Sequence, residues 1–146
     1  MALVSQEVVV EAGIEKLYDI IVDYARYPEF VPGMKACTPR TVNGETHVEY
    51  DLDVQLRRIK YVLRHREERP RKVSWSLVSG DVLKVSDGSW ELTPEGDRTR
   101  ARYSVDIQIA KLPLVPQALI DRMSDQLSRV NLPRTLEAFR LRAEGR

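Results

Sequence analysis

The chain has 146 residues, of which 42% are hydrophobic and 31% charged, and its formal net charge is +1. This composition is typical of one domain with a single core, and the small net charge gives no overall attraction to nucleic acid or to an anionic membrane. The one cysteine, Cys37, excludes a disulfide framework within the chain and a cysteine-rich metal site. The first residues lack the pattern of a signal peptide, and no apolar run approaches the roughly 20 residues that span a bilayer. We therefore expect a single cytoplasmic domain over residues 1–146.

The chain opens with a predicted strand near Leu3–Val10, followed by an amphipathic helix. Ile14, Leu17 and Ile21 recur at the three- and four-residue steps of one helical face. The next segment, Asp23–Pro32, reads DYARYPEFVP and predicts a second short helical turn that ends in a tight aromatic corner with two prolines. Such a corner is typical of the wall of a cavity.

From about Lys35 to Ile109 the chain has no convincing helical period, and it reads as a sheet. Hydrophobic residues alternate with polar ones, which is the period of strands with one buried face. This alternation occurs at Val48–Leu56, Ile59–Leu63, Val73–Leu77 and Tyr103–Ile109. Turn residues between these runs, most clearly Asn43 and Gly44, predict that consecutive strands pair as hairpins. We expect about seven strands.

A long helix is predicted to begin near Pro116 and to lie across the sheet. Its first apolar stripe contains Ile120, Met123, Leu127 and Val130, whereas Leu132, Leu136 and Phe139 fall on the opposite side of an ideal helix. Something must therefore rotate the stripe, and we expect Pro133 to kink or break the helix there. The kink would either fit the helix to a curved sheet or form a hinge at a pocket mouth.

Familiar catalytic motifs are missing from the sequence. The two histidines, His47 and His65, do not have the spacing of a metalloprotease, and the seven glycines form no phosphate-binding loop. We therefore expect no bound metal and no cofactor.

Five aromatic residues share strand parity with aliphatic neighbours and are predicted to point inward: Tyr50, Tyr61, Trp75, Trp90 and Tyr103. Packed cores use the same residues, but ligand pockets are also mostly apolar with a few fixed polar groups. We predict that these residues line a cavity for a small hydrophobic or aromatic ligand. The predicted ligand-binding residues are Tyr27, Phe30, Tyr50, Tyr61, His65, Trp75, Trp90, Tyr103, Met123 and Leu127.

His65 shares the inward parity and is, with Tyr61, a weak candidate for moving a proton. It could equally be a hydrogen-bonded histidine beside a turn. A one-residue bulge would instead turn Arg64 or Arg66 inward, where an arginine could hold an acidic or enolate oxygen.

The segment Arg57–Lys72 contains eight basic residues and is the one basic patch of the sequence. It is interpreted first as the solvated face of an antiparallel hairpin. The alternatives are transient contact with an acidic membrane surface and contact with a ribosome or another nucleic acid. No interleaved exposed aromatics support base stacking, and we expect no sequence-specific nucleic-acid binding.

Two segments give the chain a family resemblance: the corner at Asp23–Pro32 and the hairpin at Val78–Pro94, in which Trp90 matches a glycine-x-tryptophan motif. Together they resemble the START-like superfamily, closest to its coenzyme Q-binding and polyketide cyclase/dehydrase branches. The resemblance implies an α+β helix-grip fold. In that fold a curved antiparallel sheet of about seven strands wraps around a long C-terminal helix, with two short helices after the first strand and an apolar pocket inside.

The branches imply different functions. The coenzyme Q-binding branch implies a carrier or chaperone that holds a prenylated quinone or other lipid without changing it. The polyketide branch implies a cyclase or dehydratase with an acid/base group and an arginine in the pocket, and neither is assured here at a matching position. A related ribosome-associated toxin branch implies binding to the large ribosomal subunit. Because fold does not fix function, we prefer the carrier and leave the enzyme and the interaction module as alternatives.

Overall fold

The computed structural model describes residues 3–54 and 57–146. The elements follow in the order β1 (Leu3–Val10), α1 (Ile14–Val22), the 3₁₀ helix η1 (Tyr24–Glu29), β2 (Met34–Val42), β3 (Glu45–Asp53), β4 (Arg58–Glu68), β5 (Lys72–Gly80), β6 (Leu83–Glu95), β7 (Arg98–Ile109), α2 (Gln117–Asp125), the π-helical turn η2 (Gln126–Asn131) and α3 (Leu132–Ala143).

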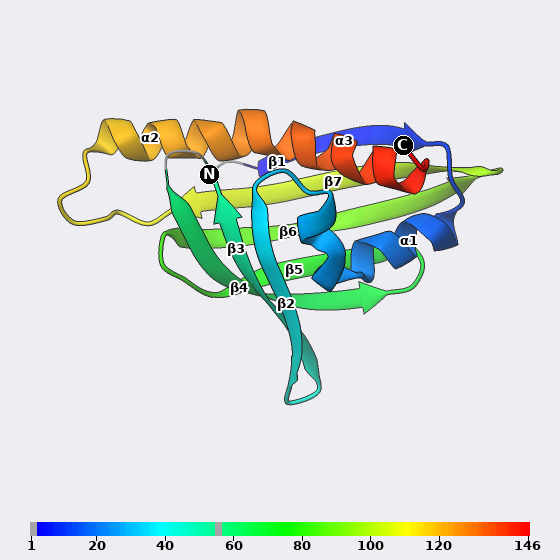
Figure 1. Ribbon diagram of the computed structural model, residues 1–146, viewed down its shortest axis with the longest axis horizontal. Helices are drawn as coiled ribbons and strands as arrows, with labels where there is room; N and C mark the ends of the chain where they lie inside the picture. Colours follow the sequence, from blue (N-terminus) through cyan, green and yellow to red (C-terminus); the bar gives the residue numbers. More distant parts are fainter. Residues whose placement is uncertain (1–2, 55–56) are drawn as a thin grey trace.

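The strands form one antiparallel sheet in the order β1-β7-β6-β5-β4-β3-β2. The sheet curves beneath the long C-terminal helix, and α1 lies at one end (Figure 1). This arrangement confirms the predicted helix-grip architecture, with seven strands and two short helices after the first strand. The two-residue period explains it, because every second side chain along β3 faces the helix and is buried: Val48, Tyr50 and Leu52.

The β2–β3 hairpin turns at Asn43 and Gly44, whose φ angles of 51° and 80° are those of a type I′ turn. The hairpin projects from the body of the sheet (Figure 1). Strand β3 ends at Asp53, and the predicted continuation through Gln55 and Leu56 lies outside the described residues.

The apolar face of α1 buries Leu17, Tyr18 and Ile21, as its spacing predicts. Directly after it, η1 buries Tyr24 and Tyr27 and packs against β2. The sole cysteine, Cys37 on β2, is buried in the same core, and burial raises the pKa of its thiol to about 12.

The C-terminal helix runs from Gln117 to Ala143 without a break, so of the two alternatives at Pro133 the break is wrong and the kink stays a prediction. The stripe does rotate, but through the π-helical turn η2, where the buried residues Leu127 and Leu132 stand five positions apart. Five residues is the hydrogen-bond step of a π-helix, and the turn therefore brings both halves of the stripe onto one face. Pro133 lies in the first turn of α3, directly after η2 has interrupted the regular hydrogen-bond ladder, so its missing amide donor costs less there than in a regular helix interior. Val130, predicted on the buried face, is exposed.

Candidate functional site

A cavity of about 100 Å³ lies between the inner face of the sheet and the C-terminal helix. Its walls are mostly apolar and come from η1, all the strands from β3 to β7, the start of β2, and the helix from η2 onward. The lining residues are Tyr27, Val31, Met34, Tyr50, Leu52, Ile59, Tyr61, Leu63, His65, Trp75, Leu83, Ser86, Trp90, Tyr103, Val105, Ile107, Leu127, Asn131, Leu132, Thr135 and Phe139.

Eight of the ten residues predicted to bind ligand line this cavity, and two do not. Phe30 packs outside it, with its ring 5.0 Å from that of Phe139 and the Arg142 guanidinium 4.9 Å from its ring centroid. Met123 is buried one turn before Leu127, in an apolar cluster with Val54 and Val82 that adjoins the cavity, but it does not line the cavity itself. The other eight residues lie together as the strand parity predicts, and whether they bind a ligand stays a prediction.

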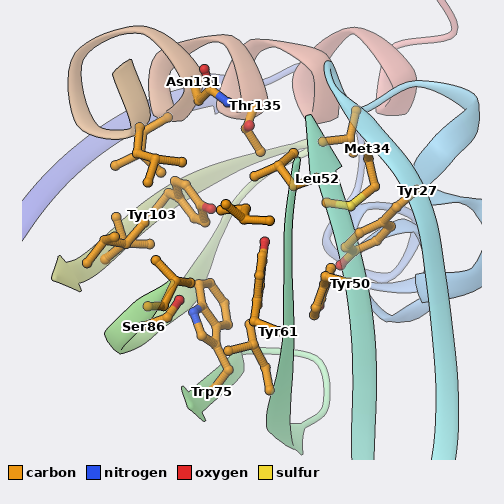
Figure 2. A pocket seen from close by; sticks show the side chains of 18 of the residues that line it. Tyr27, Met34, Tyr50, Leu52, Tyr61, Trp75, Ser86, Tyr103, Asn131 and Thr135 are labelled. Carbon is orange, nitrogen blue, oxygen red and sulfur yellow. The ribbon is translucent and has the colours of Figure 1, made fainter. Parts of the chain in front are cut away.

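Two tyrosine residues, Tyr61 and Tyr103, contribute hydroxyl groups to the wall of the cavity. Tyr61 and Tyr103 reach from the sheet toward the helix residues Asn131 and Thr135 (Figure 2). Within the described residues neither hydroxyl makes a hydrogen bond. Burial raises the pKa of both phenols, so both remain protonated and can donate to a ligand oxygen.

Tyr50 and His65 form a buried hydrogen-bonded pair, with 2.7 Å between the Tyr50 hydroxyl and the His65 Nε2. The Tyr50 ring also stacks on Tyr61, at 5.0 Å between centroids and 14° between planes. Burial lowers the pKa of His65 to about 3 and raises that of Tyr50, so both groups are neutral near pH 7. The Nδ1 atom of His65 is buried and has no hydrogen-bond partner in the part of the chain that the structure describes. A neutral imidazole of this kind can donate or accept one more hydrogen bond, but it carries no charge.

The aromatic wall is held in place by specific contacts. The Tyr27 hydroxyl donates to the carbonyl oxygen of Ile21, which ties the corner to the end of α1. The Trp75 indole lies over Gly88, where an added Cβ would come within 2.6 Å of the indole and 2.4 Å of the Ser104 carbonyl oxygen. The absence of a side chain at Gly88 therefore leaves the space in which the Trp75 indole packs.

Among the described residues, no arginine or lysine lines the cavity. The bulge considered for this region falls on β5, where Val78 is the extra residue opposite Val62 and Leu63, so β4 keeps its parity. Arg64 and Arg66 therefore point outward and are exposed, and His65 points inward. The cavity offers hydroxyl, imidazole, indole and amide groups and no fixed charge.

The sequence-based prediction missed several lining residues. Ile59, Leu63 and Leu52 share the inward parity and could have been found from it. Asn131 and Thr135 could not be placed, because the helical phase was carried through an assumed kink. The signal was available in the five-residue step from Leu127 to Leu132, which is the period of a π-helix.

The basic segment Arg57–Lys72 lies on β4 and the turn that follows it, and its basic side chains are mostly exposed. Three of them make ion pairs: Arg58 with Asp51, Arg64 with Glu45, and Arg69 with both Glu15 and Asp19. Arg57, Lys60, Arg66, Arg71 and Lys72 make none within the part of the chain that the structure describes. The solvated-hairpin interpretation thus accounts for the first three residues.

Within residues 3–54 and 57–146, no group of three or more His, Cys, Asp or Glu side chains could hold a metal ion. None of the described helices is both long enough and apolar enough to cross a membrane.

An antiparallel seven-stranded sheet curved around a C-terminal helix, with an apolar cavity between the two, defines a START-like helix-grip protein. Solved structures agree. The aromatase/cyclase ZhuI of Streptomyces sp. R1128 matches with a TM-score of 0.86 at 17% identity, over 98% of this chain and 93% of that one. A START superfamily protein of Mycobacterium smegmatis matches with a TM-score of 0.78 at 23% identity, over 98% and 97% of the two chains.

The family is shown by sequence. The chain belongs to the polyketide cyclase/dehydrase and lipid transport family, whose model matches residues 1–137. Among curated proteins, the ribosome association toxin RatA of Vibrio cholerae serotype O1 is 33% identical over 98 residues. The match covers 64% of this chain and 65% of the toxin, just under two thirds of the relative's length.

Proposed function

We propose that residues 1–146 form one ligand-binding domain that holds a small hydrophobic or aromatic molecule in the cavity and acts as its carrier or chaperone. The observation that carries this proposal is a cavity with apolar walls, no charged side chain, and two unpaired tyrosine hydroxyls. Apolar walls favour ligand burial by roughly 25 cal/mol per Å² removed from water. The hydroxyls of Tyr61 and Tyr103 would orient a carbonyl, quinone or phenol oxygen. The single, unpaired cysteine fits work in the cytoplasm.

The size of the cavity sets a condition on this function. Pockets for small molecules usually measure roughly 300–1,000 Å³, whereas this cavity measures about 100 Å³. A ligand larger than a single ring must therefore displace part of the wall. We propose that the π-helical turn η2, which covers the cavity at Leu127 and Asn131, yields together with the preceding α2.

Mass spectrometry of an organic extract from the gently purified protein, compared with an unrelated protein prepared in parallel, tests the proposal first. A stoichiometric isoprenoid quinone or lipid would identify the ligand class of a carrier. Binding of the uncharged fluorophore N-phenyl-1-naphthylamine provides a second measurement. Thr135→Trp should fill the cavity and abolish binding, whereas Arg129→Trp, on the exposed side of the same helix, should bind as the wild type does. Equal binding by both variants would exclude the cavity as the site.

A second candidate function is that of a polyketide cyclase or dehydratase, which the family and the aromatase/cyclase fold both suggest. The specific observation is the buried Tyr50–His65 pair in the cavity wall, in which the His65 Nδ1 has no hydrogen-bond partner among the described residues. Enforced proximity and a proton-transfer group are what an aldol cyclisation needs. His65→Gln and Tyr61→Phe should then abolish turnover of a poly-β-ketone substrate while ligand retention persists. Unchanged turnover in both variants would remove this role.

An interaction module is the third candidate, and the name of the toxin relative suggests a ribosome as partner. The five basic side chains of Arg57–Lys72 without ion-pair partners would supply the contact. Charge reversal at Arg66 and Arg71 should weaken a salt-sensitive association with ribosomes. Association that ignores both salt and charge reversal would leave this candidate without support.

A further inference from the structure

The loop from Ala110 to Pro116, which joins β7 to α2, contains an exposed leucine, Leu114. The loop forms the left-hand extremity of the molecule in Figure 1. The Leu114 side chain is fully exposed, at 104% of its reference area, whereas the other two exposed large hydrophobic residues in the described chain, Val78 and Val130, reach 49% and 37%. A leucine in this position lacks any packing role within the chain.

The backbone conformation does not explain the leucine either. The Val115 amide donates to the Leu112 carbonyl oxygen at 3.3 Å, which closes a four-residue turn. Pro113 occupies the second position of this turn, and Leu114 occupies the third with a φ of +63°. A positive φ at the third position favours glycine or asparagine, and a leucine there is strained. The side chain of Leu114 is therefore present despite its conformational cost, on a turn restrained by Pro113 and Pro116.

An apolar surface connects this tip to the cavity. Residues 112–120 contain no charged side chain, in a chain that is 31% charged. Leu112 and Leu119 pack against the apolar cluster that contains Leu83 and Leu127. Leu83 and Leu127 also line the cavity. The tip is thus the outer end of a continuous apolar path that starts at the candidate ligand site.

Three basic side chains lie on the elements that adjoin the tip. Lys111 precedes it, Arg122 lies on α2, and Lys84 lies on β6 beside the end of β7. All three are exposed, and none makes an ion pair within the described residues. Two exposed carboxylates near this end accept hydrogen bonds. The side-chain amide of Gln117 donates to Asp121 at 3.0 Å, and the backbone amide of Lys60 donates to Asp81 at 3.2 Å. An apolar tip with a basic rim complements a lipid surface with anionic head groups.

We propose that the turn Leu112–Val115 docks into the interfacial region of an anionic lipid bilayer, with Leu114 inserted and Lys111, Arg122 and Lys84 against the head groups. One short apolar turn gives weak, reversible binding, which suits a protein that visits a membrane. The purpose of the docking, transfer of an apolar ligand, rests on the proposed function, but the docking itself is measured independently of it.

Vesicle flotation tests the proposal, with phosphatidylcholine vesicles prepared with and without phosphatidylglycerol. The wild-type protein should float with the anionic vesicles and less with the neutral ones. Leu114→Asn keeps the turn, because asparagine accepts the positive φ, and it removes the apolar side chain. We expect it to reduce the partition coefficient by about tenfold or more, with a melting temperature equal to or above that of the wild type. Val78→Asn, at an exposed hydrophobic residue on β5, is the matched control and should float as the wild type does.

Several outcomes would overturn the proposal. A wild-type protein that does not float with either vesicle, or a Leu114→Asn variant that floats equally well, excludes membrane docking through this turn. Concentration-dependent self-association that Leu114→Asn abolishes, without vesicle binding, assigns the tip to a second copy of the chain instead. N-phenyl-1-naphthylamine binding separates the two hypotheses. If only docking fails, Leu114→Asn and wild type still bind the fluorophore; if only the ligand site fails, flotation persists without fluorophore binding.

Discussion

The two halves of the C-terminal helix are held in different ways. The second half, α3, buries Leu136, Phe139 and Ala143 and packs against α1 and β1. The first half, α2, buries Ile120 and Met123 and packs mainly against β7. The π-helical turn η2 separates the halves directly over the cavity. The candidate ligand site therefore has a well-packed wall at the α3 end. At the α2 end the helix makes few contacts with the sheet, and we expect a ligand to enter there.

The largest expected effect comes from truncating the fixed wall. The Phe139 ring is 5.2 Å from Tyr27, 5.0 Å from Phe30 and 5.1 Å from Trp90, and its side chain is 3% exposed. Phe139→Ala should lower the free energy of unfolding by about 3–5 kcal/mol, and Met123→Ala by only about 2 kcal/mol. Urea denaturation measures both. A larger loss from Met123→Ala would reverse the comparison between the two halves.

Proline substitutions test whether the π-helical turn relieves strain locally. Pro133→Ala should change the free energy of unfolding by less than about 1 kcal/mol, because Pro133 already stands in a first turn. Ala138→Pro lies inside the regular part of α3 and should cost about 3 kcal/mol or more. Equal costs at the two positions would show that η2 gives the proline no special accommodation.

The pH dependence of the free energy of unfolding reports whether His65 stays buried away from water in the folded protein. The folded protein holds the pKa of His65 at about 3, below the ordinary value of 6.5. The unfolded chain therefore binds a proton first as pH falls, and stability is lost between pH 6.5 and pH 3 by up to about 1.4 kcal/mol per pH unit. His65→Gln should remove this contribution from the slope measured by urea denaturation. A slope unaffected by the substitution would assign the proton to other groups.

The smallest effect concerns the far end of α3. The Glu144 Oε2 accepts a hydrogen bond from the Glu11 amide at 2.9 Å, and this contact holds the pKa of Glu144 below its usual range. Glu144→Gln should cost roughly 1 kcal/mol near pH 7. Gln117→Ala, which removes the Gln117–Asp121 contact at the start of α2, is the matched change in the other half. We expect it to have a smaller effect on thermal unfolding, and a larger one would weaken the case for a loosely held α2.

Much of this architecture could be predicted from the sequence, because a two-residue period fixes which side chains face inward. Tyr50, Tyr61 and Trp75 were placed in this way, and the aromatic wall follows from them. The two-residue period does not predict how the corner orients its side chains or where the helix lies along the cavity. Phe30 shares the corner with Tyr27 but turns away from the cavity, and Met123 shares the helix face with Leu127 but lies one turn too early.

The helix shows the limit most clearly. Pro133 was a visible signal and suggested a break, although the cause of the rotation lies in the spacing before it. The position of Leu114 was also beyond the sequence, since an exposed leucine with a positive φ is unfavourable locally and is recognised only in the folded loop.

The buried thiol of Cys37 allows local opening of the sheet to be measured by its rate of alkylation. It is the single cysteine of the chain and lies on β2, an edge strand of the sheet. With its pKa at about 12, almost none of it is thiolate at neutral pH, and the folded sheet also excludes an alkylating reagent. Each alkylation event would therefore record one opening of that edge. The alkylation rate of the wild-type protein, with and without ligand, would measure how much a ligand in the cavity reduces the opening of β2.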